Sequence, residues 1–131
     1  MRYLLDANAV IGLLNDATSK LAQRVRRERP ADVAISAIVA HELFYGAFRS
    51  ARVAHNVALV DALQFAVLEF DKEDAREAGE VRAVLASRGT PIGPYDVLIA
   101  GQAKARKLTL VTHNTDEFGR VPGLRLADWQ S

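Results

Sequence analysis

The chain has 131 residues, of which half are hydrophobic and a quarter are charged, a composition typical of one globular domain with its own core. It contains no cysteine, which excludes disulfides, thiolate metal sites and cysteine nucleophiles. The formal net charge of +1 neither requires nor excludes nucleic acid as a partner.

No segment approaches the roughly 20 apolar residues that a membrane-spanning helix needs. The apolar stretch that follows Met1 is also too short for a signal peptide. We therefore expect a cytoplasmic protein without a membrane partner, folded as a single domain over residues 1–131.

Short apolar runs alternate with longer stretches of helical periodicity along the chain. Pro30 is expected to stop one helix, Ser36 to cap the start of the next, and Gly89 to end a later one. In chain order, the expected elements are a strand at 2–5, helices at 8–14 and 18–29, a strand at 33–35, helices at 37–48 and 53–65, a strand at 65–70, a helix at 72–87, a rigid loop at 90–94, a helix at 95–106, and strands at 108–112 and 124–126.

This alternation of short buried strands and helices predicts the α/β class. The strands are expected to pair in parallel, with helices covering both faces of the sheet. In such sheets the functional site lies at the carboxyl ends of the strands, near the point where the strand order switches direction.

Three acidic residues occupy positions that this architecture would bring to one edge. Asp6 ends the first strand, Asp96 opens the helix at 95–106, and Glu42 lies in the second turn of the helix that Ser36 caps. Carboxylates in apolar surroundings are costly unless a compensating charge is present. Because oxygen ligands suit hard divalent cations, the three acids predict a site for Mg²⁺ or Mn²⁺.

Each acid also has a simpler interpretation. Asp6 and Asp96 both stand where a carboxylate can cap a helix N-terminus, and capping alone would explain either one. Glu42 belongs to a largely apolar helix, where it could instead pair with an arginine. It is the combination of all three that favours a shared metal site over three separate structural roles.

The segment after the strand at 108–112 offers further oxygen donors. Asn114, Asp116 and Glu117 are all candidates for a fourth position in the site, and a solvated polar turn is the alternative for each of them. Thr112 is placed to orient a carboxylate by hydrogen bonding.

Basic residues are available to hold a phosphate backbone. Lys20, Arg24 and Arg27 recur at helical spacing and would form one basic face, while Arg49 and Arg52 lie elsewhere in the chain. Taken one at a time, each of them is better explained as ordinary surface charge. Beside Asp96, the ring of Tyr95 could either stack on an unpaired base or pack in the core.

At these residues the chain resembles the PIN-domain ribonucleases, specifically the VapC-type toxins of bacterial toxin–antitoxin pairs. The resemblance covers essentially the whole chain, and four motifs carry it in order. They are Leu4-Leu5-Asp6-Ala7-Asn8, then Ser36-Ala37-Ile38 with His41-Glu42-Leu43 and Tyr45-Gly46-Ala47, then residues 92–100 (Ile-Gly-Pro-Tyr-Asp-Val-Leu-Ile-Ala), and finally residues 110–118 with Val121-Pro122-Gly123-Leu124 and Asp128-Trp129.

The resemblance implies a three-layer α/β/α sandwich around a parallel sheet and metal-dependent endonucleolytic cleavage of RNA. The subgroup with this ending cuts initiator tRNA in the anticodon stem-loop, which would inhibit translation and growth. The resemblance also implies a homodimer and neutralisation by a cognate VapB-type antitoxin, with a higher assembly of the two. An arginine of that antitoxin could enter the acidic groove. Residues that could line its docking groove are Leu13, Leu14, Phe44 and Phe48.

Carried over by position, Asp6 and Asp96 become metal ligands, and Glu42 completes the acidic triad and positions metal or water. Glu117 is implied as the fourth acid, while other relatives place an aspartate where Asn114 stands, which makes Asn114 a further candidate ligand. Two departures would weaken metal binding: a hydroxyl is missing at Ala7, and Asn114 carries no charge.

Two other functions fit parts of the sequence. His41 and His113 could act as acid and base in a metal-independent ribonuclease. The chain could also be a non-catalytic module that binds RNA or protein on the same fold. A phosphoaspartyl hydrolase is disfavoured, because its second aspartate would fall at Asn8.

Overall fold

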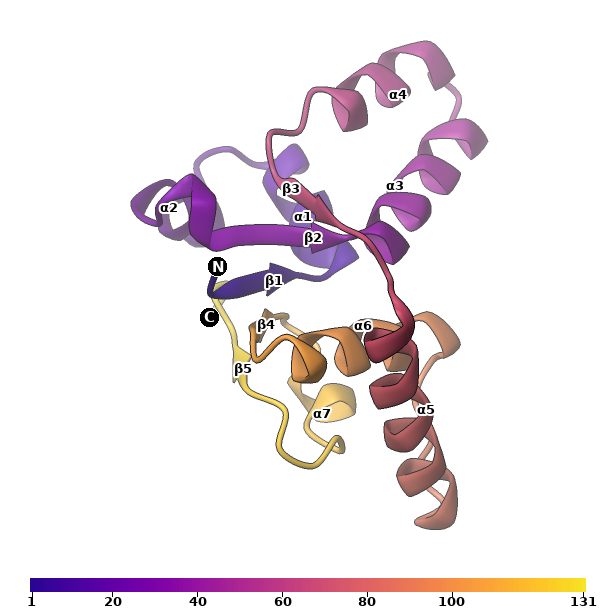
Figure 1. The fold of residues 1–131 in the computed structure, drawn as a ribbon. Helices are drawn as coiled ribbons and strands as arrows, with labels where there is room; N and C mark the ends of the chain where they lie inside the picture. The colour runs from indigo at the N-terminus through magenta and orange to yellow at the C-terminus, as the bar shows by residue number, and fades with distance from the viewer.

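The computed structural model describes residues 1–131 and is organised around one five-stranded sheet (Figure 1). All four strand pairs are parallel, and the strand order is β3-β2-β1-β4-β5. The strands are β1 (Tyr3–Leu5), β2 (Val33–Ser36), β3 (Ala66–Leu68), β4 (Thr109–Val111) and β5 (Leu126–Ala127). The α/β class and the parallel sheet expected from the sequence are confirmed.

Seven α-helices and one short 3₁₀ turn connect these strands. The helices are α1 (Ala7–Asn15), α2 (Lys20–Arg27), α3 (Ala37–Arg49), α4 (Val53–Asp61), α5 (Lys72–Ser87), α6 (Pro94–Ala105) and α7 (Thr115–Phe118), and the turn is Pro30–Asp32. None of the helices is long and apolar enough to cross a lipid bilayer.

The strand order sets the layers of the molecule. The chain moves outward from β1 to β2 and β3, then returns to the other side of β1 to form β4 and β5. Right-handed crossovers therefore place the helices that link β1 to β2 and β2 to β3 on one face and those that link β3 to β4 on the other. The result is the three-layer α/β/α sandwich, with its switch in strand order between β1 and β4.

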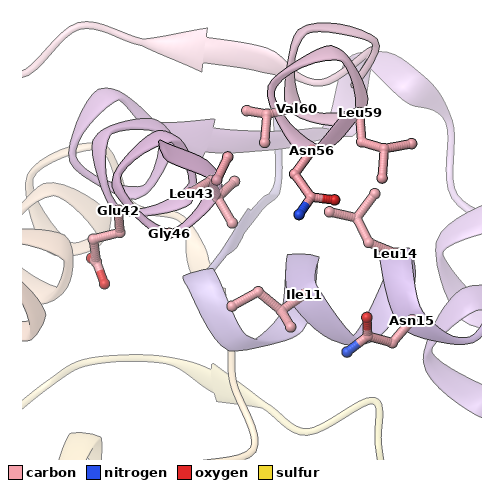
Figure 2. A pocket seen from close by; sticks show the side chains of 10 residues that line it. Ile11, Leu14, Asn15, Glu42, Leu43, Gly46, Asn56, Leu59 and Val60 are labelled. Carbon is pink, nitrogen blue, oxygen red and sulfur yellow. The ribbon is translucent and has the colours of Figure 1, made fainter. Parts of the chain in front are cut away.

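The core lies around the central strands. Every residue of β1 and β2 is buried, and α6 contributes the most buried residues of any helix. By contrast, α4 has no buried residue, and edge strand β3 leaves Val67 exposed. Between α1, α3 and α4 runs an apolar groove that ends at Glu42 (Figure 2).

Local sequence signals place most helix ends correctly. The Ser36 hydroxyl accepts a hydrogen bond from the backbone N–H of Ile38 at 3.0 Å and caps α3. Gly89 follows α5 with φ of 69°, the left-handed conformation that suits glycine at this position. The helix before Pro30 ends at Arg27, close to the expected boundary.

Three boundaries differ from expectation. α4 ends at Asp61 rather than residue 65, because residues 62–65 turn back toward β3. The last strand is 126–127 rather than 124–126, since a turn with Gly123 at φ 75° precedes it. The polar segment after β4 contains an unforeseen short helix, α7, capped by Asn114.

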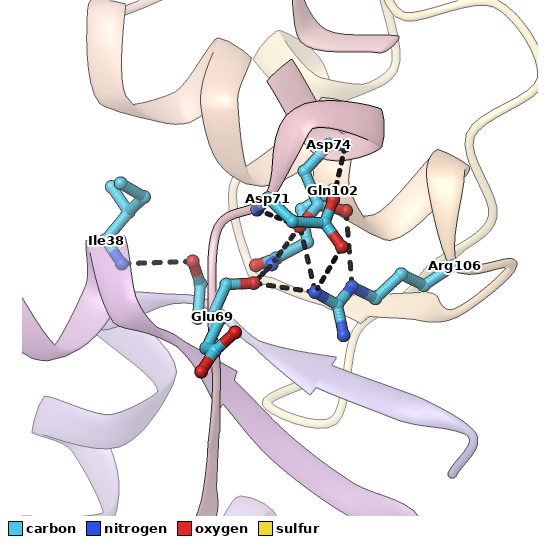
Figure 3. A network of polar contacts seen from close by, with 7 residues as sticks. Ile38, Glu69, Asp71, Asp74, Gln102 and Arg106 are labelled. Carbon is cyan, nitrogen blue, oxygen red and sulfur yellow. Dashed lines mark hydrogen bonds and ion pairs between the residues drawn. The ribbon is translucent and has the colours of Figure 1, made fainter. Parts of the chain in front are cut away.

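A buried polar network ties α5 to α6 and to the chain that leaves β3 (Figure 3). Asp74 is 1% exposed; Gln102 and Arg106 both donate hydrogen bonds to it at 2.9 Å, and both also donate to the Glu69 carbonyl. Burial disfavours the charge of Asp74, but the bonds from Arg106, the Asp71 N–H and Gln102 outweigh this and lower its pKa. The network anchors the α6 helix that carries Asp96.

Close packing of α5 on α6 requires glycine at position 101. A Cβ at Gly101 would lie 2.4 Å from the Cα of Ala78, whereas a Cβ at Gly79 in α5 would meet nothing within 4 Å. We expect Gly101→Ala to lower the free energy of unfolding by about 1–3 kcal/mol, because the helices must separate. Gly79→Ala, the matched control, should instead raise it by roughly 0.5–1 kcal/mol. Urea denaturation of both variants measures this, and equal effects would contradict it.

Candidate active site

Asp6 joins the end of β1 to the start of α1 and lies directly at the switch between β1 and β4. Its side chain accepts a hydrogen bond from the N–H of Ala9 at 2.8 Å, so the capping role considered from the sequence is real. Its own backbone N–H donates to the carbonyl of Val111 at the end of β4. Burial raises the pKa of Asp6, while Thr112, the Ala9 N–H and His113 oppose that rise.

Glu42 enters the same region from α3. Burial raises the pKa of this carboxyl, and the negative charges of Asp96 and Asp6 raise it further. The Oε1 atom of Glu42 is buried and has no hydrogen-bond partner. The arginine partner considered as an alternative is therefore absent, and one carboxylate oxygen remains uncompensated.

Asp96 approaches from the first turn of α6. Burial, followed by the charges of Glu117 and Asp6, raises its pKa to about 6. A Cβ at Gly93 would lie 3.2 Å from the Asp96 Oδ2 atom, so glycine at this position leaves room for the carboxylate to fold back over the helix start. The three acids expected to share a site thus interact electrostatically in the folded protein.

The segment after β4 brings Glu117 into this group. The Oε1 atom of Glu117 accepts the backbone N–H of Gly93 at 3.0 Å, and its Oε2 atom accepts the Asn114 side-chain amide at 2.7 Å. These bonds, with that of Asn114 first, lower the pKa of Glu117 and keep it ionised. Asp116, in contrast, is exposed on the outer side of α7.

The α7 helix and the Gly93 contact were missed in the sequence, although one signal was present. Asn114 followed three residues later by a glutamate is a helix-start pattern, and the Asn114 carbonyl oxygen does accept the Glu117 N–H. The bond from Gly93 spans 24 residues and has no local signal.

The acids do not converge into a preformed group of three that could hold a metal ion. The donor set nevertheless fits a hard divalent cation. The donors are carboxylate oxygens, burial and then acidic neighbours raise the pKa values of Glu42 and Asp96, and Glu42 has an unpartnered buried oxygen.

The other candidate residues each have partners of their own. His113 contacts Asp128 with its Nδ1 atom at 3.0 Å, whereas the His41 ring packs on Tyr95, so each imidazole has a different partner. Arg24 pairs with Glu28 at 2.9 Å and covers the ring of Trp129. Basic and aromatic side chains form a shallow pocket there, lined by Lys20, Gln23, Arg24, Arg27, Asp128, Trp129 and Ser131.

The comparisons with known proteins agree with this geometry. The sequence profile of the PIN domain matches residues 3–124. This chain belongs to the PIN domain family. The tRNA(fMet)-specific endonuclease VapC of Salmonella typhimurium is 38% identical over 131 residues, and the Ribonuclease VapC2 of Rickettsia felis is 33% identical over 132 residues; each alignment covers 98% of both chains.

Solved PIN-domain structures show the same fold. The crystal structure of DNA-bound VapBC from Salmonella typhimurium superposes with a TM-score of 0.94 at 38% identity, over 98% of each chain. VapBC-1 from nontypeable Haemophilus influenzae gives a TM-score of 0.90 at 31% identity over 100% of each chain. The VapC-type resemblance expected from the motifs is confirmed.

Crowding of carboxylates in this PIN domain predicts a measurable stability cost. Asp96 has a pKa of about 6 when folded and about 4 when unfolded, so the folded state holds the proton more tightly and stability falls as pH rises between these values. Without divalent cations at pH 7, Asp96→Asn should therefore raise the free energy of unfolding by about 1–2 kcal/mol, allowing for solvent screening.

Urea denaturation in EDTA measures this effect, and the difference between variant and wild type should shrink at pH 4.5. Asp116→Asn is the matched control, because this exposed carboxylate lies outside the cluster and its removal should change stability by less than roughly 0.5 kcal/mol. Equal stabilisation by both substitutions, or a loss of stability in Asp96→Asn, would contradict the electrostatic interpretation.

Proposed function

We propose that this protein is the toxin of a VapBC-type toxin–antitoxin pair and an endoribonuclease that cleaves tRNA, with initiator tRNA cut in the anticodon stem-loop as its substrate. One observation carries the proposal. At the strand switch of a PIN domain, the charges of Asp6, Glu42, Asp96 and Glu117 lie close enough to influence one another, in a chain that aligns over 98% of its length with a tRNA(fMet)-specific endonuclease.

Mg²⁺, or Mn²⁺ in its place, is the proposed cofactor. Asp6, Asp96 and Glu42 would hold it. Glu117 is the proposed fourth acid, and the side-chain amide of Asn114 orients it. Asn114 itself is a weaker candidate ligand, because both its polar atoms contact Glu117. When bound, the cation polarises the scissile phosphate and activates water for in-line attack.

The chain's own residues prepare the site for that reaction. Glu42 is the proposed proton acceptor, because its raised pKa and its unpartnered Oε1 atom allow it to take a proton from the attacking water. Thr112 and the Ala9 N–H fix Asp6, and Gly93 and Asn114 fix Glu117. The pocket of Lys20, Arg24 and Arg27 supplies positive charge for the RNA backbone.

The apolar groove between α1, α3 and α4 is the proposed docking site of the antitoxin (Figure 2). Ile11, Leu14 and Leu59 line it and are about 40% exposed, an unusual state for large apolar side chains, and Glu42 closes one end. A basic side chain on a segment bound in this groove would therefore lie near the acids. A homodimer, assembled further with the antitoxin, is part of the same proposal.

RNA cleavage should depend on the acids and on divalent cations. We expect Asp96→Asn to lower the cleavage rate at least roughly 100-fold, because a group that acts on the reacting atoms is removed. EDTA should abolish cleavage by wild type, and Mg²⁺ or Mn²⁺ should restore it. Mapping of new RNA ends after brief expression of wild type and Asp96→Asn measures both the catalysis and the substrate.

The same mapping separates the competing functions. Identical RNA ends in wild type and Asp96→Asn would overturn the nuclease assignment and leave a binding module. Cleavage that survives EDTA and is lost in His41→Ala but kept in Asp6→Ala would replace it with histidine-based chemistry. Asp116→Asn is the control for the loss of an acidic residue outside the cluster.

Antitoxin binding should depend on the apolar groove and not on apolar surface in general. Leu59→Asp should weaken the complex with the cognate antitoxin by roughly tenfold or more, because a charge would be buried at the centre of the contact. Val53→Asp is the matched control, since Val53 is equally exposed on α4 but lies outside the groove. Titration calorimetry measures the affinities, and RNA cleavage by both variants should be retained. Equal weakening by both would refute this docking site.

A further inference from the structure

Two exposed aromatic rings stand beside the acidic group and have no role in the proposed chemistry. The rings of His41 and Tyr95 lie 5.5 Å apart, tilted by 55° to each other. His41 directly precedes Glu42 on α3, and Tyr95 directly precedes Asp96 on α6. The ring pair therefore joins α3 to α6, the same two helices that carry Glu42 and Asp96.

Core packing does not explain this pair. Tyr95 is 48% exposed, and His41 is also exposed, so the alternative of a core role for Tyr95 is wrong. The contact that the structure gives for the Tyr95 side chain is the ring of His41. The ring of Tyr95 is thus held on one side by His41 and leaves much of its surface open to solvent.

We propose that Tyr95 stacks on an unpaired base of the RNA at the nucleotide next to the scissile phosphate, with His41 bracing the tyrosine ring. The inference rests on the proposed function, because it requires RNA cleavage at the Asp96 site. It adds a rule for the substrate: the cut must fall where a base is free to leave its own stack, in a loop or bulge rather than inside a duplex.

The position of the ring favours a nucleobase as its occupant. Tyr95 and Asp96 are consecutive residues in the first turn of α6, so a base stacked on the ring would belong to a nucleotide near that acid. The aromatic ring carries no charge, so it can hold the strand without taking the place of the cation beside the carboxylates. Every base has an aromatic face, so this contact is tolerant of sequence and selects for an unpaired nucleotide.

The test couples a protein substitution to an RNA substitution. A synthetic RNA hairpin that carries the mapped cut site is compared with the same hairpin lacking the base on one side of the cut, and then on the other. On the intact hairpin, Tyr95→Ala should lower kcat/KM by roughly 5- to 150-fold, the range for loss of one stacked base. On one of the two abasic hairpins, wild type and Tyr95→Ala should cleave equally, because the contact is already gone.

Control variants separate stacking from general damage. Tyr95→Phe should behave as wild type, since only the ring is needed. Tyr45→Ala removes an equally exposed tyrosine that contacts Arg49 one turn along α3, and its effect should be the same on intact and abasic hairpins. His41→Ala should lower kcat/KM on the intact hairpin by part of the loss seen in Tyr95→Ala. His41→Phe should restore kcat/KM, because His41 acts as a positioning residue and not as an acid or base.

A binding measurement gives a readout that does not require turnover. The measurement uses the Asp96→Asn variant and a hairpin with 2-aminopurine beside the cut. Changing Tyr95 to alanine in this variant should lower the affinity for the hairpin and reduce the quenching of the 2-aminopurine fluorescence. If Tyr95→Ala lowers the affinity equally for the intact hairpin and both abasic hairpins, the stacking assignment is overturned. Dissociation of the dimer in Tyr95→Ala, with no difference between the hairpins, would overturn it as well. If Asp96→Asn still cleaves, the proposed function fails instead, so the two failures are distinguishable.

Discussion

The parallel pairing of β1 with β4 is the contact on which the whole site depends. Tyr3 aligns with Thr109 and Leu5 with Val111, so both strands end at the same level. The N–H of Asp6 continues the ladder by donating to the Val111 carbonyl. These bonds bring the residues after β1 and those after β4 to one edge, although more than 100 residues of chain separate Asp6 from Thr112.

The acids at this edge are unfavourable to folding and must be held by the surrounding structure. Burial and mutual repulsion raise the pKa values of Glu42 and Asp96, which means that the folded protein stores electrostatic strain at neutral pH. The rigid packing of α6 offsets it: Gly101 lets α5 approach closely, and Asp74 binds Arg106 at the other end of the helix. A site that is costly without a cation is well suited to binding one.

The exposed surfaces divide into two kinds around this centre. On one side, the groove between α1, α3 and α4 is apolar and continuous, as expected for a surface that another protein covers. On the rim, the pair of His41 and Tyr95 is small and adjoins the acids, which suits a single flat base. Glu42 borders both surfaces, so partner and substrate would compete near the same carboxylate.

Much of the fold could be predicted because its signals are local. The strands are short apolar runs, and Ser36, Pro30 and Gly89 mark helix ends through their own backbone chemistry. The missed α7 lies where polar turn residues dominate, whereas the last strand is displaced because the turn at Gly123 precedes it. Asp6, Glu42 and Asp96 could be proposed as site residues because their signals are local too, since each follows a recognisable strand end or helix start.

The sequence by itself determined the α/β class, the order of the elements and the three acids that are proposed for the site. Only the tertiary structure decided that Glu117 lies close enough to act on Asp96, because the bond from Gly93 to Glu117 joins residues 24 apart that no local pattern connects. It also decided that Tyr95 faces solvent while Gln102 and Asp74 are buried. Helical periodicity shows which residues share a face, but the neighbouring element determines whether that face is covered.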